Sequence, residues 1–202
     1  MIHVLAVIAG LAAGFIRAKI GKRAYQPENL KAIWLVLVAV IPQWLAFSFS
    51  PTRSAFPDWV ASSALVLSQA ILLLFAVLNW KSAGFWLLGL GLVMNLLVIV
   101  TNGGFMPISP ETVSWLTPGI PSSLWSVGER FAGGKDIVLP VESTLFYFLS
   151  DHFRSPDFDL FRVAFSLGDI FIAIGAFWLL WAIGGEKRGL RAQENSNGSN
   201  GV

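Results

Sequence analysis

Cysteine is absent from the sequence. Without a thiol the chain forms no disulfide, no thiolate metal site and no cysteine nucleophile, and its redox compartment stays undetermined. Histidine is almost as scarce, since His3 and His152 are the only two. Two histidines are too few for a catalytic zinc site unless carboxylates such as Asp151 join them. We therefore expect no metal and no other cofactor.

Charged residues are also few. They make up 13% of the 202 residues, whereas hydrophobic residues make up 55% and the mean hydropathy is +0.67. A soluble domain carries about 25% charged residues, because its surface needs a polar shell. This chain lacks the charge to cover a globular surface. The composition therefore predicts an all-α integral membrane protein.

Five apolar segments approach or reach the roughly 17–25 residues that a membrane span needs. They are residues 2–16, 32–49, 59–78, 85–100 and 163–183. Tryptophans near several segment ends support these boundaries, because such rings favour the membrane–water interface. A cleaved signal peptide is the alternative for the short first segment, although basic residues follow that segment instead of preceding it. We predict one membrane domain, residues 1–185, with about five transmembrane helices.

The distribution of lysine and arginine predicts the orientation of these spans. If every span crosses, most of the 14 basic residues share one side, which the positive-inside rule assigns to the cytoplasm. The N-terminus is then outside, and the tail 186–202, rich in Asn, Ser and Gly, is a disordered cytoplasmic segment. The basic cluster from Arg17 to Lys31 is expected to meet anionic lipid headgroups rather than nucleic acid.

Residues 101–162 form a long extracytoplasmic loop between the fourth and fifth predicted spans. The loop is too long for a plain connector, and its apolar side chains argue against disorder. Its prolines predict short helices and turns. Residues 137–149 are interpreted as a re-entrant or interfacial piece, because Pro140 and Glu142 argue against a sixth span.

Asp169 is the one carboxylate well inside these apolar segments. An intramembrane charge costs at least a few kcal/mol unless it is paired, so it marks a candidate functional site. Counting at 1.5 Å per residue places Asp169, Asn95 and Gln43 about 8–9 Å below the outer edges of their spans. We predict a cluster in which Asn95 and Gln43 donate to the carboxylate, with Arg162 as a further candidate partner. Helix-packing glue and a ligand site both remain open.

A glycine motif follows the fourth segment, Asn102-Gly103-Gly104-Phe105-Met106-Pro107. It is typical of a helix C-cap and a sharp turn. The functional alternative is a backbone nest whose amides face a ligand beside Asp169. The spacing matches neither a Walker loop nor a dinucleotide fingerprint.

Together with the nearby Ser109-Pro110-Glu111, and with Ser166-x-Gly168-Asp169 at the last span, this motif resembles a bacterial family of small multi-span membrane proteins. That family is a domain of unknown function, and the resemblance covers most of the chain. It implies a bacterial plasma-membrane protein and supplies no catalytic residues.

Small residues recur on one face of the first segment, at Ala6, Gly10 and Gly14. Such a face lets another helix approach closely. The helix that it meets belongs either to this chain or to a partner membrane protein.

The favoured function is a binding or accessory protein with an outward-facing polar pocket. The candidate ligand-binding residues are Asp169, Asn95, Gln43, Asn102, Gly103, Gly104 and Ser166. A small transporter or channel component is the alternative, but the inner halves of the spans are nearly all apolar. A membrane enzyme using Asp169 as acid or base is less favoured. No second intramembrane carboxylate completes an aspartyl protease dyad, and serine hydrolase motifs are absent.

Overall fold

A helix lies in each of the five apolar segments. The computed structural model describes residues 2–23, 25, 30–49, 55–121, 124–156 and 162–184. The apolar helices are α1 (Ile2–Ile20), α2 (Trp34–Phe47), α4 (Asp58–Leu78), α5 (Phe85–Thr101) and α7 (Leu167–Ile183). By length and composition, α1 and α4 can cross a membrane, whereas the other three are apolar but shorter. The fold is therefore mostly helical, as predicted, and the predicted tail 186–202 lies outside the described residues.

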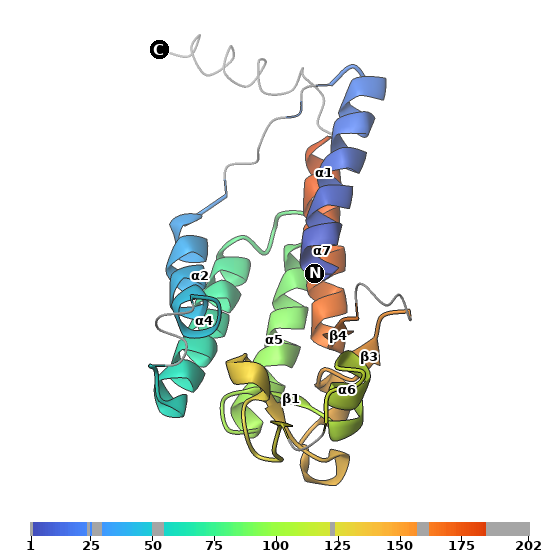
Figure 1. The fold of residues 1–202 in the computed structure, drawn as a ribbon. Coiled ribbons are helices and arrows are strands. Elements are labelled where there is room, and N and C mark those ends of the chain that lie inside the picture. Colours follow the sequence, from blue (N-terminus) through green and yellow to red (C-terminus); the bar gives the residue numbers. More distant parts are fainter. Residues whose placement is uncertain are drawn as a thin grey trace.

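The five helices form an open row rather than a closed bundle. Helix α2 packs against α4, α4 against α5, α5 against α7, and α7 against α1. Figure 1 shows α2 and α4 on one side and α1 and α7 on the other, with α5 between them. Helices α1 and α7 run in the same direction, since His3 lies near Asp169 and Gly14 lies near Leu180. Consequently α1 and α2 are the two ends of the row.

Glycines let the helices on both sides of α7 approach it closely. Gly91 of α5 faces the backbone of Gly168, and Gly10 and Gly14 of α1 are buried against α7. Such close approach strengthens van der Waals packing between apolar helices. The small-residue face of α1 is thus covered within the chain. A partner protein at Gly10 and Gly14 stays a prediction.

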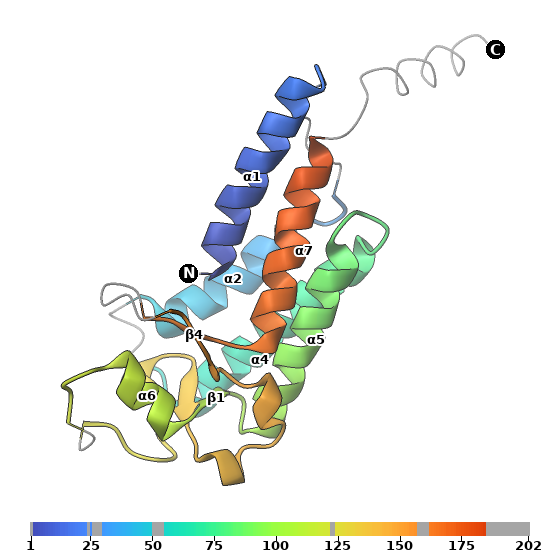
Figure 2. The ribbon, with the colours of Figure 1, turned by 90° about the vertical axis from the view of Figure 1, so that its right-hand side faces the viewer.

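Residues 102–166 are named here the connecting segment, and those of them that the structure describes gather at one end of the row (Figure 2). Strand β1 (Met106–Ile108) pairs in parallel with β2 (Asp136–Val138), and β3 (Phe153–Arg154) pairs antiparallel with β4 (Ala164–Phe165). The short helices are α6 (Pro110–Leu116) and the 3-10 turns η2 (Phe131–Gly133), η3 (Val141–Ser143) and η4 (Tyr147–Leu149). Residues 137–149 therefore contain strand and turns and do not form a single helix. Their membrane depth stays a prediction.

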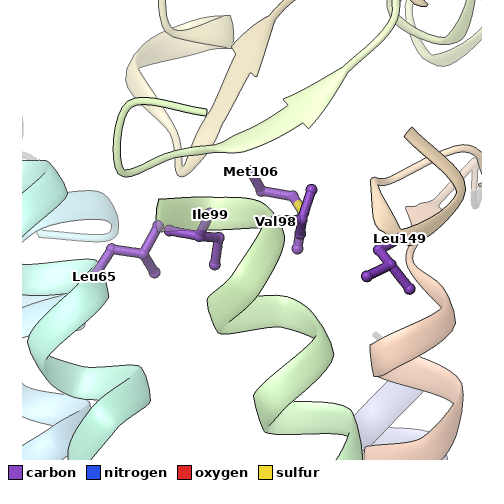
Figure 3. Packing of buried hydrophobic residues seen from close by; sticks show 5 residues of the cluster. All are labelled: Leu65, Val98, Ile99, Met106 and Leu149. Atoms are coloured by element: carbon purple, nitrogen blue, oxygen red, sulfur yellow. The ribbon is translucent and has the colours of Figure 1, made fainter. Parts of the chain in front are cut away.

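An apolar cluster anchors the connecting segment to the helices. Met106 of β1 and Leu149 of η4 pack with Leu65, Val98 and Ile99 from α4 and α5 (Figure 3). All five side chains are at most 4% exposed. A fully buried side chain of this size contributes about 1.5–3 kcal/mol. The connecting segment is therefore part of the folded core.

Replacing Gly91 with alanine should lower the melting temperature. The added methyl would lie 2.7 Å from the Ile172 side chain and would collide with the Gly168 carbonyl oxygen. Overpacking of this kind costs about 1–3 kcal/mol. Gly89→Ala is the matched control on the same helix, because its methyl would lie 3.8 Å from Ala76. Equal thermal unfolding of the two variants in detergent would contradict the close contact.

Candidate functional site

Asp169 lies in the first turn of α7 rather than deep inside a span. The Ser166 hydroxyl oxygen accepts from the Asp169 amide at 3.0 Å, and Asp169 Oδ2 accepts from the Ser166 amide at 3.2 Å. These two bonds form a capping box, which satisfies amides that lack helical partners. The helix begins at Leu167 rather than at residue 163, because β4 and the cap occupy the first residues of the predicted segment. The depth of Asp169 in a membrane stays a prediction.

Asn95 of α5 completes a buried hydrogen-bond triangle with Ser166 and Asp169. Its Nδ2 donates to Asp169 Oδ1 at 2.9 Å, and its Oδ1 accepts from the Ser166 hydroxyl at 2.9 Å. Gly168 leaves room for this amide, since a Cβ at position 168 would collide with Asn95 Oδ1. The predicted donation from Asn95 is confirmed. The Ser-x-Gly-Asp motif therefore has a packing role.

Gln43 is not brought to this triangle. It lies on α2, whose main packing partner is α4, and no hydrogen bond joins it to Asp169 within the described residues. The predicted donation from Gln43 was wrong, because equal depth does not make two helices neighbours. The number of residues from the edge of a span predicts the position of a side chain along the helix axis, but it does not predict which helices are neighbours.

Asn102 and the glycines after it form a structural turn. Asn102 Nδ2 donates to the carbonyls of Val98 at 2.7 Å and Leu145 at 2.9 Å, and its Oδ1 accepts from the Leu145 amide at 3.0 Å. Gly103 and Gly104 have φ of +80° and +87°, the left-handed region that glycine tolerates. This geometry fits the C-cap interpretation. Asn102, Gly103 and Gly104 are not among the described residues that line the cavity below.

A cavity of about 310 Å³ lies where the starts of α1 and α7 meet the connecting segment. Apolar residues such as Ile2, Ile108 and Val163 form part of its wall. Six ionisable side chains also line it: His3, Lys135, Asp136, Asp151, Arg162 and Asp169. A concave, partly apolar site with several convergent polar groups is the usual form of a small-molecule site.

Lys135 joins two of these carboxylates. Its Nζ lies 2.6 Å from Asp136 Oδ1 and 2.7 Å from Asp151 Oδ2. Burial works against the charged ammonium, but the two carboxylates outweigh it and raise the pKa of Lys135 above its ordinary value. Lys135 therefore stays charged and is committed to these two partners.

Asp151 is the most deeply buried carboxylate of the cavity. Its side chain is 4% exposed, and its Oδ1 has no hydrogen-bond partner among the described residues. Burial raises the pKa of Asp151 to about 7, Lys135 opposes this effect, and Asp136 and Asp169 add to it. One oxygen of Asp151 is therefore an unsatisfied acceptor on the cavity wall.

His3 and Arg162 bring nitrogen donors to the same wall. His3 Nε2 lies 3.5 Å from Asp169 Oδ1. Among the described residues, His3 Nε2 has no hydrogen-bond partner. The Arg162 guanidinium donates to the Trp115 carbonyl at 2.9 Å and lies 5.6 Å from the centre of its ring. His3 and Arg162 thus both belong to the cavity lining.

The acids and the lysine that the connecting segment brings to the cavity were not predicted from the sequence. Lys135 and Asp151 come together because Asp136 pairs with Met106 across the parallel strands and the Asp151 amide donates to the Pro107 carbonyl at 3.2 Å. Such non-local pairing leaves no local sequence signal. His3 had a usable signal, since two spans that start on the same side can bring His3 and Asp169 together.

Asn95→Leu should destabilise the fold. The substitution leaves the Ser166 hydroxyl and Asp169 Oδ1 without their buried amide partner, and an unsatisfied buried polar group costs about 1–3 kcal/mol. Gln43→Leu removes a comparable amide outside the triangle and should change stability less. The two variants are compared by the fraction of folded protein that remains after heating, measured by size-exclusion chromatography. Equal losses would contradict the triangle.

Asp151→Asn should remove a pH dependence of stability. The folded-state pKa of about 7 lies above the ordinary 3.8, so the folded state holds this proton more tightly than the unfolded state. The stabilisation is complete below pH 3.8 and is lost as the pH rises through 7. Thermal unfolding between pH 5 and pH 8 should therefore show the wild type losing stability more steeply than Asp151→Asn. Parallel curves would contradict the raised pKa.

Comparison with known proteins yields one family. A model described as a family of unknown function (DUF5317) matches residues 28–181, which include the connecting segment and the Asn95–Ser166–Asp169 triangle. No curated protein and no solved structure matches the chain. The resemblance seen in the sequence is confirmed at the level of the family: the chain belongs to this family of unknown function.

Proposed function

We propose that the chain is a multi-span bacterial plasma-membrane protein that binds a small polar ligand in an outward-facing cavity. The observation that carries this proposal is the unsatisfied Asp151 Oδ1, on the wall of a cavity with five further ionisable side chains. An unsatisfied buried oxygen costs free energy, and a bound donor would recover it.

Exposed apolar surface supports a membrane setting for all five helices. Each carries large exposed side chains, including Leu5, Leu37, Leu67, Val100 and Ile174. Leu37 is 65% exposed, and apolar surface on this scale calls for a covering medium or partner. Helix α2 has 14 residues, which is short for a span, and the flanking Ile33 and Phe49 extend its apolar length.

The directions of the helices support five crossings. The starts of α1, α4 and α7 and the ends of α2 and α5 lie toward the connecting segment, as contacts such as His3–Asp169 and the packing of Ala46 with Ala61 indicate. Successive helices therefore alternate in direction. The positive-inside rule puts the connecting segment and the N-terminus outside and the C-terminus in the cytoplasm.

Binding is favoured over transport and catalysis. The ionisable groups of the cavity all lie at the connecting-segment end, while the opposite halves of the helices are nearly all apolar in sequence. Transport would need a polar path through those halves. Asp169 is a poor acid or base, because its oxygens already accept from Asn95 and Ser166.

The absence of cysteine makes labelling a clean test. Ala164→Cys places a small thiol on the cavity wall, whereas Ser126→Cys and Lys81→Cys place exposed thiols in the connecting segment and in the turn between α4 and α5. A membrane-impermeant thiol reagent applied to intact cells should label positions 126 and 164. Position 81 should react only after permeabilisation.

Two results would overturn this proposal. Labelling of position 81 in intact cells would contradict the orientation. Labelling of position 126 without position 164, in protein that elutes as a folded species, would mean that the cavity is closed to outside solutes.

A further inference from the structure

We infer that the outer cavity selects a small monocationic primary amine, whose ammonium is held by Asp151 Oδ1. The inference rests on the proposed outward-facing cavity and assigns its ligand class. Two permanent cations, Lys135 and Arg162, face three carboxylates, those of Asp136, Asp151 and Asp169. The lining carboxylates thus outnumber these two cations by one.

The hydrogen-bond partners of the lining side chains indicate which kind of charged ligand the cavity can hold. Lys135 Nζ is committed to Asp136 and Asp151 Oδ2, and the Asp169 oxygens are committed to Asn95 and Ser166. Asp151 Oδ1 lacks a partner among the described residues, as does His3 Nε2. Asp151 Oδ1 can therefore accept an N–H bond from an ammonium, which carries three donors.

The size and walls of the cavity favour an organic cation over a metal ion. About 310 Å³ is far more than a bare ion fills, and no group of three or more His, Asp or Glu side chains suited to a metal occurs in the described residues. Ile2, Ile108 and Leu116 give apolar contact for a short alkyl stem. An anion would face the uncompensated carboxylate.

Protons should compete with the amine. The titratable and charged groups facing the cavity are His3 from α1, Asp169 from α7, and Lys135, Asp136, Asp151 and Arg162 from the connecting segment. Without an amine, a proton on Asp151 offsets the third carboxylate. A bound ammonium makes this proton unnecessary, so binding releases about one proton by linkage. Amine binding should therefore weaken as the pH falls below 7.

Charged thiol reagents test the ligand class directly. Ala164→Cys would be modified at pH 8 by 2-aminoethyl methanethiosulfonate, a cation, and by 2-sulfonatoethyl methanethiosulfonate, an anion. The rate for the cationic reagent is divided by the rate for the anionic reagent. This ratio at Ala164→Cys is then divided by the same ratio at the exposed Ser126→Cys, which gives the normalised ratio. One unbalanced charge a few ångströms away in a partly buried site should give a normalised preference on the order of tenfold for the cation. Ethylammonium chloride should slow the cationic reagent more than equal sodium chloride does.

Three variants in the Ala164→Cys background link the preference to named atoms. Asp151→Asn should bring the normalised ratio close to one. His3→Lys, at a side chain that is 43% exposed, adds a fixed cation beside Asp169 and should do the same without removing a carboxylate. Glu142→Gln removes an exposed carboxylate of the connecting segment and should keep the full preference. An N-terminally extended form controls for the α-amino group.

The outcomes separate the ligand class from the cavity itself. A cation preference that Asp151→Asn or His3→Lys abolishes and Glu142→Gln keeps supports the amine site. Equal rates for the two reagents at position 164 would overturn the ligand class and leave the accessible cavity standing. No reaction at position 164 in folded protein would overturn both.

Discussion

The fold depends on one buried hydrogen-bond triangle between Asn95, Ser166 and Asp169. It ties the start of α7 to α5, and each member satisfies polar atoms of the others. Gly168 and Gly91 bring the two backbones close enough for the triangle to close. Charge-assisted bonds in surroundings of low dielectric are worth more than those in water. Because α7 is the main packing partner of α1, the position of α1 depends on this junction as well.

Asp169 and Asp151 differ in how fully their carboxylate oxygens are hydrogen-bonded. Asp169 is held by the cap and by Asn95, so it serves mainly as structure and contributes charge to the cavity. Asp151, held on one oxygen by Lys135, keeps the other oxygen unsatisfied on the cavity wall. The residue that looked functional in sequence is thus an organiser. Asp151, which we propose to bind the ligand, comes from the connecting segment, which the apolar cluster around Met106 fixes to the helices.

The helices could be predicted from the sequence because long apolar runs are a strong local signal. The predicted bounds of α4 and α5 lie within about a residue of the observed bounds, and the Asn95–Asp169 contact was predicted. The start of α7 was misplaced, since Ser166 is compatible both with a span residue and with a helix cap. Gln43 was assigned by depth although the order of the helices decides contact. Lys135 and Asp151 were missed because strand pairing and a loop contact distant in sequence join them.

The most direct test of this account is a double-mutant cycle between Asn95→Leu and Asp169→Asn, measured as free energy of unfolding in detergent. Both side chains belong to one hydrogen-bond network, so their effects should not add. We predict a coupling energy of about 1–3 kcal/mol, with the double variant little less stable than the worse single variant. Simple additivity of the two losses would contradict the central role of the triangle.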